Sequence, residues 1–197
     1  TAGGAERRRF YTENFDAGNA GNWSFVKGKW RLMPVGRRVL RGLAGQGEAV
    51  AEHRHFEEKN CTVTAWVRVD AIERPKSSFS IAVRRSGDFE VRLAVMHGDE
   101  EWTARLNLVR GEKRVRSSEP RVLPDMPANS FEGMLRLDAR GGSVRGQVGN
   151  IFVGRLDGLS GPFTESGGVA IRARFCRTSW DEIAMTAPRD VEIAKET

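Results

Sequence analysis

Glu90 is the residue of this sequence whose surroundings suggest chemistry. It lies inside the alternating stretch 88–96, between Phe89 and Val91. Because side chains alternate between the two faces of a strand, Glu90 points away from the apolar positions and shares its face with Arg84 and Arg92. A carboxylate among guanidinium groups can take part in hydrolysis. It can equally form a cross-strand ion pair worth about 0.2–1 kcal/mol, which is the simpler interpretation.

The sequence lacks the patterns of the common hydrolytic sites. Glycoside hydrolysis needs two carboxyl groups about 5–10 Å apart, and no Glu-x-Asp-x-x-Glu pattern is present to supply them. There is also no Gly-x-Ser-x-Gly motif, no phosphate-binding loop and no credible Cys–His dyad. We therefore expect a protein without catalytic activity and keep hydrolysis through Glu90 as an alternative.

The strand face opposite the apolar positions carries one indole and many guanidinium groups. Sugar rings stack on indole rings, and their oxygens accept hydrogen bonds from arginine. The alternative is a solvated face whose charges protect strand edges and favour solubility. Thr64 and Arg105 share this face. The predicted ligand-binding residues on it are Trp66, Arg68, Arg84, Glu90, Arg92, Arg172 and Arg174.

The net charge is positive and is carried mostly by arginine. Lysine and arginine number 32 against 26 acidic residues, which gives a formal net charge of +6. One interpretation is a genome that favours arginine codons. The other is an anionic partner such as an acidic glycan, because guanidinium forks match carboxylate and sulfate. A nucleic acid partner is not expected, since the arginines alternate with acids instead of forming a basic run.

Metal and disulfide chemistry find little support in the sequence. Cys61 and Cys176 lie far apart and are either buried thiols or one disulfide. The three histidines, His53, His55 and His97, have no companion ligands at zinc spacing. We expect no cofactor beyond a calcium ion, which is considered below.

Short stretches of strict alternation, separated by clusters of glycine, aspartate, asparagine and proline, hold these residues. This pattern is typical of an all-β sandwich or barrel. The stretches 77–85, 88–96 and 101–109 predict a three-stranded meander. A proline-rich crossing at 117–130 could hold one helical turn. Further strands are expected at 61–69, 131–139, 143–148, 150–156, 168–176 and 178–186.

The strand pattern predicts one domain over residues 10–186, with flanking tails at 1–9 and 187–197. No apolar run approaches the roughly 20 residues that span a bilayer, so membrane insertion is not expected. Because the chain begins with Thr1 rather than Met, we expect a processed protein or a domain of a longer one. Nothing in the sequence indicates an oligomeric state.

Five blocks of sequence point to a known superfamily by their order and spacing. They are ENFDAGNAGNWSFVKGKWRLM (13–33), RRVLRG (37–42), HFEEKNCTVTAWVRVD (55–70), GDFEVRLAV (87–95) and GVAIRARFCRTSWDEIAM (168–185). Together they resemble bacterial concanavalin A-like, laminin G-like domains of the lectin and glucanase superfamily. The resemblance implies an all-β fold, a two-sheet antiparallel jelly-roll sandwich.

In that superfamily the first and last strands pair. This would put Phe15 and Asp16 beside Trp180 and Asp181. Asp181 would then hold a structural calcium ion with backbone carbonyls, or cap the nearby turn by accepting backbone N–H bonds.

A weaker resemblance concerns the tripeptide Phe89-Glu90-Val91, which is similar to the central strand of bacterial 3-keto-disaccharide hydrolases. The Gly-Ala-Ile-Tyr and Trp-Asn companion motifs of that family are missing. The leading hypothesis is therefore a non-catalytic carbohydrate-binding or accessory module of a larger extracytoplasmic protein. A glycoside-type hydrolase that uses Glu90 and a structural or adhesion spacer are the alternatives.

Overall fold

The computed structural model describes residues 10–35 and 37–188, and nearly all of its regular structure is antiparallel strand. A short 3-10 helix, η1 (Gly161–Thr164), precedes β15. The expected tails 1–9 and 187–197 lie outside the described residues, apart from Ala187 and Pro188. The strands are β1 (Phe10–Glu13), β2 (Trp23–Lys27), β3 (Lys29–Val35), β4 (Arg37–Leu43), β5 (Glu48–Glu58), β6 (Cys61–Ile72), β7 (Ser78–Ser86), β8 (Phe89–His97), β9 (Trp102–Arg110), β10 (Lys113–Ser117), β11 (Arg121–Leu123), β12 (Phe131–Arg140), β13 (Ser143–Val148), β14 (Ile151–Leu156), β15 (Gly167–Arg174) and β16 (Cys176–Thr186).

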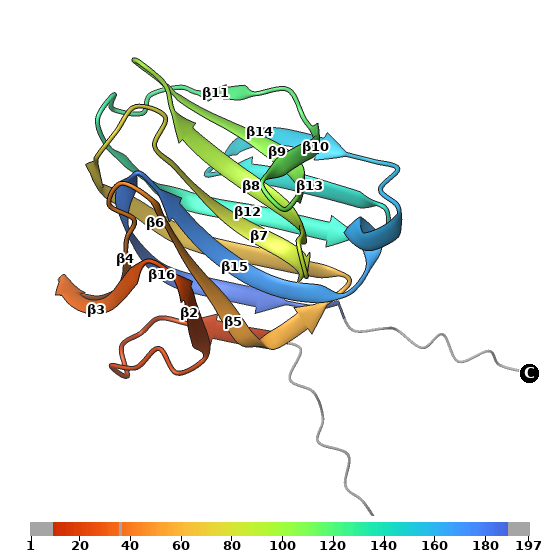
Figure 1. Ribbon diagram of the computed structural model, residues 1–197, viewed down its shortest axis with the longest axis horizontal. Coiled ribbons are helices and arrows are strands. Elements are labelled where there is room, and N and C mark those ends of the chain that lie inside the picture. The colour runs from red at the N-terminus through yellow and green to blue at the C-terminus, as the bar shows by residue number, and fades with distance from the viewer. Residues whose placement is uncertain (1–9, 36, 189–197) are drawn as a thin grey trace, which may run out of the picture.

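The strands form two eight-stranded sheets that pack face to face (Figure 1). Sheet I has the order β14-β13-β12-β6-β16-β4-β3, and β1 pairs with β16. Sheet II has the order β10-β9-β8-β7-β15-β5-β2, and β11 pairs with β9. The predicted all-β, two-sheet sandwich is thus confirmed, as is the meander β7-β8-β9.

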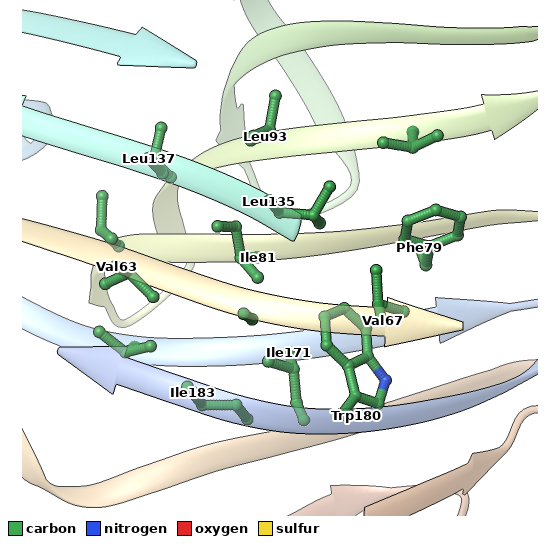
Figure 2. Close-up of a cluster of buried hydrophobic side chains, with 14 of the residues drawn as sticks. Val63, Val67, Phe79, Ile81, Leu93, Leu135, Leu137, Ile171, Trp180 and Ile183 are labelled. Carbon is green, nitrogen blue, oxygen red and sulfur yellow. The ribbon is translucent and has the colours of Figure 1, made fainter. Parts of the chain in front are cut away.

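The core lies between the sheets and is made by the inward positions of each alternating strand. Figure 2 shows branched aliphatic and aromatic side chains from both sheets meeting in the middle. Ile81 of β7 and Leu93 of β8 face Val63 of β6 and Leu137 of β12, and all four are fully buried. A register slip of one residue would turn each of these sets to solvent, so burial of one face fixes the pairing.

Two local expectations differ from the structure. The segment 117–130 contains the short strand β11 and no helical turn; the helical turn occurs at η1. The strand expected at 168–176 ends at Arg174, because Phe175 has a φ of 56° in the left-handed region. There the chain leaves sheet II, and Cys176 already belongs to β16 of sheet I.

The two cysteines are free thiols at opposite ends of the paired strands β6 and β16. Cys176 lies opposite Ile72, whereas Thr62, the neighbour of Cys61, lies opposite Thr186. About ten residues of strand separate them, or about 30 Å, and a disulfide needs Cα atoms within about 7 Å. The disulfide alternative is therefore wrong. Burial raises the pKa of each thiol to about 12.

The first and last strands pair as expected, but not through the residues named for it. In β1, Glu13 is the last residue and lies opposite Ile183 of β16. Phe15 follows in a turn with a φ of 56°, and Asp16 is exposed. The predicted placement of Phe15 and Asp16 along the final strand is therefore wrong, because β1 ends before them.

Candidate functional site

The predicted arginine and tryptophan face divides between the two sheets. Trp66 and Arg68 lie on the outer face of sheet I, because β6 belongs to that sheet. Glu90, Arg92 and Arg172 lie on the outer face of sheet II, on the other side of the sandwich. The prediction of one continuous surface that includes both groups of residues is therefore wrong. Trp66 has a local partner instead, since the Arg68 guanidinium lies 5.8 Å from the centre of its ring.

Arg84 is wholly buried and joins three loops at one end of the sandwich. Its guanidinium donates to the carbonyl oxygens of Lys59 at 2.7 Å, Phe163 at 2.8 Å and Gly141 at 2.7 Å. Burial lowers its pKa from the usual value. The prediction that Arg84 contacts a ligand is wrong, because its side chain is 0% exposed and its donors are occupied by backbone carbonyls.

A β-bulge explains why Arg84 and Arg85 exchange faces. The register between β7 and β8 shifts between Val83 and Ser86, and Arg84 has a φ of 53°. An extra residue on one strand reverses the alternation beyond it. Arg85 is thereby turned to the outer face, although simple alternation from Val83 would put it in the core.

Glu90 is the centre of the ion-pair cluster on the outer face of sheet II. It accepts hydrogen bonds from Arg92 Nε at 2.8 Å, Arg172 Nη2 at 2.7 Å and Arg85 Nη1 at 3.1 Å. The cluster extends to strand β5, where Arg172 Nη1 lies 3.2 Å from Glu48 Oε1 and Arg85 pairs with Glu52. These six residues, Glu48, Glu52, Arg85, Glu90, Arg92 and Arg172, are called the Glu90 network.

The electrostatics of the network keep Glu90 ionised. Burial by itself would raise the pKa of Glu90, but the charges and hydrogen bonds of Arg92 and Arg172 lower it overall. Its side chain is 3% exposed, and both oxygens are bonded to guanidinium groups. Such a carboxylate is a fixed acceptor that orients arginines.

Sequence reasoning missed Glu48, Glu52 and Arg85. The two glutamates lie on β5, and its position beside β15 is a matter of strand order that no local pattern encodes. Arg84 was expected on the outer face in place of Arg85, because simple alternation does not reveal the bulge. The Ser86-Gly87-Asp88 turn beside it was the available signal.

Small side chains form a strip beside the network. Arg172 lies opposite Ser80, Ser80 opposite Ala94, and Ala94 opposite Arg105. Three strand spacings therefore separate the two arginines, about 14 Å. Burial and the nearby Arg114 lower the pKa of Arg105.

Two polar atoms on this face are buried without a hydrogen-bond partner among the described residues, Arg172 Nε and Asn107 Oδ1. One is a donor and the other an acceptor. Unpaired buried polar groups are rare and costly in folded proteins. A hydroxyl group, which both donates and accepts, has the chemistry that would pair either atom.

Arg174 lies at the end of β15, apart from the Glu90 network. Its side chain is exposed and its guanidinium lies 4.8 Å from the centre of the Phe175 ring. It remains available at the rim of the same outer face.

The proposed calcium site at Asp181 remains a prediction. Asp181 is buried on β16, opposite Trp66, next to a bulge at which Glu182 has a φ of 47°. Over residues 10–35 and 37–188, no group of three or more histidine, cysteine, aspartate or glutamate side chains is arranged to hold a metal ion. Calcium would thus need backbone carbonyls for most of its ligands.

Comparison with known proteins identifies the fold. No protein-family model matches the sequence, and neither does any curated protein. The structure superposes on carbohydrate binding module CBM66 from Bacillus subtilis with a TM-score of 0.66 at 10% identity, over 84% of this chain and 96% of that one. For the β-glucanase of Bacillus licheniformis the TM-score is 0.67 at 9% identity, over 91% and 98% of the two chains. The chain has the concanavalin A-like jelly-roll fold.

This jelly roll also occurs as part of longer chains. The GH43B protein of the Bacteroides ovatus xyloglucan locus matches over 95% of this chain but 41% of its own, with a TM-score of 0.68 and 15% identity. Identities this low establish the fold alone, because one fold supports many unrelated activities. In the described part of the chain, no helix has the length and apolar character needed to cross a bilayer.

Proposed function

We propose that this jelly roll is a carbohydrate-binding module that holds a glycan against the outer face of sheet II. The observation that carries the proposal is the state of Glu90, which is buried, ionised and bonded to three arginines. A glycosidase requires one carboxyl group that carries a proton to the leaving oxygen. Glu90 is held ionised and so lacks that proton, and both of its oxygens are bonded to guanidinium groups instead of being free to act as a nucleophile. Its role is to fix Arg85, Arg92 and Arg172 as donors.

The ligand that fits this face is rich in hydroxyl groups and carries negative charge. Arg105 and Arg174 have no carboxylate partner within the described residues, so the face has positive charge beyond what its glutamates balance. Arg172 Nε and Asn107 Oδ1 provide an unpaired donor and an unpaired acceptor. A structural neighbour named as a carbohydrate binding module and another named as a β-glucanase support the sugar class.

Hydrolysis is the second candidate, because the Glu90 network brings more than one carboxylate together. Glu48 and Glu52 are linked to Glu90 through Arg172 and Arg85. Glu52 is the more exposed of the two, with 32% of its side chain accessible. If the protein is an enzyme, Glu52 is the carboxylate best placed to contact a substrate, and Glu90 would orient it through Arg85.

Affinity electrophoresis with uronate-containing, sulfated and neutral polysaccharides tests the binding proposal. We expect an anionic polysaccharide to retard the wild type, and Arg105→Ala to reduce the retardation several-fold. Trp66→Ala, on the outer face of sheet I, is the matched control and should behave as wild type. No retardation by any polysaccharide would favour the spacer role, and an effect of Trp66→Ala alone would move the site to sheet I.

Product analysis of the retained polysaccharide separates binding from hydrolysis. We expect no new reducing ends after prolonged incubation with the wild type. Reducing ends that disappear in Glu52→Gln would overturn the non-catalytic proposal.

A further inference from the structure

A pocket of about 460 Å³ lies at the edge of the sandwich, away from the Glu90 network. It is formed where β2, the edge strand of sheet II, and β3, the edge strand of sheet I, lie near the loop before β2. Ligand pockets in proteins commonly measure about 300–1,000 Å³, so the volume suits one or two sugar rings. We call it the edge pocket; the lining residues used below are Asn19, Trp23, Phe25, Trp30, Arg31 and Arg54.

Two glycines bring the two edge strands into this arrangement. Gly28 joins β2 to β3 with a φ of 71°, and a Cβ there would lie 2.7 Å from Ala49. Gly42 lies opposite Trp30, and a Cβ there would lie 2.9 Å from the indole ring. The chain at both positions therefore requires glycine, and the Trp30 ring rests directly on the backbone of β4.

An aromatic pair forms one wall of the edge pocket. The rings of Phe25 and Trp30 are stacked, with centroids 6.0 Å apart and planes 15° from parallel. Trp30 is 8% exposed and donates from Nε1 to the carbonyl oxygen of Lys27 at 3.1 Å, whereas Phe25 is 46% exposed. An exposed ring backed by a fixed one is already ordered before a ligand arrives, which reduces the entropy lost on binding.

The rest of the lining is polar and positive. Arg31 and Arg54 contribute two guanidinium groups, and no acidic side chain lines the pocket. Arg54 is oriented by its Nε, which donates to the carbonyl oxygen of Trp23 at 3.1 Å. Asn19 adds an amide group to the same rim.

Trp23 supplies the second sign of a ligand. It is 1% exposed, it lines the pocket, and its Nε1–H has no acceptor among the described residues. The His53 ring packs edge-on against it at 5.3 Å, so the indole has a defined position. A buried indole N–H usually has an acceptor, and a sugar oxygen would be one.

We propose that the edge pocket binds a single sugar residue that carries one anionic group, a uronic acid or a sulfated sugar. The apolar face of the ring stacks on Phe25, and the carboxylate or sulfate pairs with Arg31 and Arg54. This proposal rests on the proposed function only in assuming that the ligand is a carbohydrate. The residues of this second site come from β2, β3, β5 and the loop before β2, and none belongs to the Glu90 network.

Titration with monosaccharides tests the proposal directly. Glucuronic acid, glucose 6-sulfate and glucose are added separately to the protein while intrinsic fluorescence is followed, since Trp23 and Trp30 line the pocket. We expect glucuronic acid or glucose 6-sulfate to bind saturably at millimolar concentration and glucose to bind at least tenfold more weakly. Whether glucuronic acid or glucose 6-sulfate binds more tightly shows whether the site prefers a carboxylate or a sulfate.

Two substitutions separate the stacking wall from the cationic rim. Phe25→Ala should weaken every sugar at least tenfold, and Arg31→Gln should reduce the affinity for the anionic sugar several-fold without changing that for glucose. Circular dichroism and thermal melting verify that both variants are folded. Arg155→Ala, in an exposed ion pair of sheet I outside both proposed sites, is the control and should leave monosaccharide binding unchanged.

The edge-pocket proposal is overturned if no anionic sugar binds saturably or if Phe25→Ala binds as wild type. A loss of monosaccharide binding in Arg105→Ala would also overturn it, because it would place the ligand on sheet II. Failure of the proposed function looks different. In that case polysaccharide retardation is absent or insensitive to Arg105→Ala, while glucuronic acid still requires Phe25.

Discussion

The two outer faces of the sandwich carry the same residue types in different arrangements. On sheet I, the more exposed arginine–aspartate pairs join residues two apart on one strand or just beyond its end, as in Arg136 with Asp138 at 2.8 Å and Arg155 with Asp157 at 2.7 Å. Asp70 on β6 differs, since it pairs both with Arg68 on its own strand and with Arg41 on β4. On sheet II, the pairs connect β5, β7, β8 and β15, and their central carboxylate is buried. In the sequence both faces are alternations of charged and apolar residues.

The difference shows that the order of strands in the sheet decides which partners a charged side chain of an alternating strand meets. A local pair on a solvated face is screened and contributes little. A carboxylate such as Glu90, which joins β7, β8 and β15, is removed from water, and its charge must be balanced where it lies. The Glu90 network holds three arginines in defined positions around one buried carboxylate, which suits a binding face.

The largest expected effect concerns the centre of the Glu90 network. Glu90→Gln removes the charge that balances Arg85, Arg92 and Arg172, and we expect a loss of about 3 kcal/mol in the free energy of unfolding. Urea denaturation measures it. Asp157→Asn, in an exposed pair of sheet I, is the control and should leave the midpoint unchanged. Equal losses in the two variants would show that the two faces do not differ energetically.

A pH titration sharpens the same contrast. Because the folded-state pKa of Glu90 lies below its ordinary value of 4.5, its contribution is complete above that value and is lost as the pH falls through the folded-state pKa. The stability gap between wild type and Glu90→Gln should therefore be constant from about pH 7 to pH 5 and shrink below about pH 4. Thermal melting of both proteins across this range measures the gap. A gap that widens on acidification would contradict the ionised state of Glu90.

Salt dependence should distinguish the faces in binding. Polysaccharide affinity that relies on Arg105 and Arg174 should fall as salt rises from low to physiological concentration, where charges are screened within about 8 Å. Arg174→Ala should weaken binding severalfold at low salt and much less at high salt. Trp66→Ala should have no effect at either concentration. Binding that is independent of salt would indicate a neutral glycan held without these arginines.

The smallest effect is expected at Asp138 on sheet I. Burial alone would raise its pKa, but hydrogen bonds from Arg136 and Thr62 lower it overall. The Arg136 side chain is 49% exposed, so solvent screens most of the interaction. We expect Asp138→Asn to cost at most about 1 kcal/mol in urea denaturation. A loss as large as that of Glu90→Gln would mean that within-strand pairs are as strong as the network.

Much of the fold could be predicted from local pattern. Strict alternation located strands such as β6 and β8 and the inward positions of Val63 and Leu93, because burial of one face imposes a period of two. The site depended on information that alternation does not contain. The bulge at Arg84 exchanged the faces of Arg84 and Arg85. The position of β5 beside β15 brought Glu48 and Glu52 into the Glu90 network, and the place of β6 in sheet I put Trp66 on the other side of the sandwich.

The pairing of β1 with β16 also determines how the chain could be reconnected. Phe10 lies opposite Thr186, and Cα atoms of opposed antiparallel residues are about 4.5–5.5 Å apart. A short linker could therefore join the two ends of the β framework. New ends could be opened at the β7–β8 turn, where Gly87 has no neighbouring atoms within 4 Å of a Cβ position. The same geometry lets the whole sandwich be inserted into a surface loop of a host protein, because such a loop would have to separate its own ends only slightly.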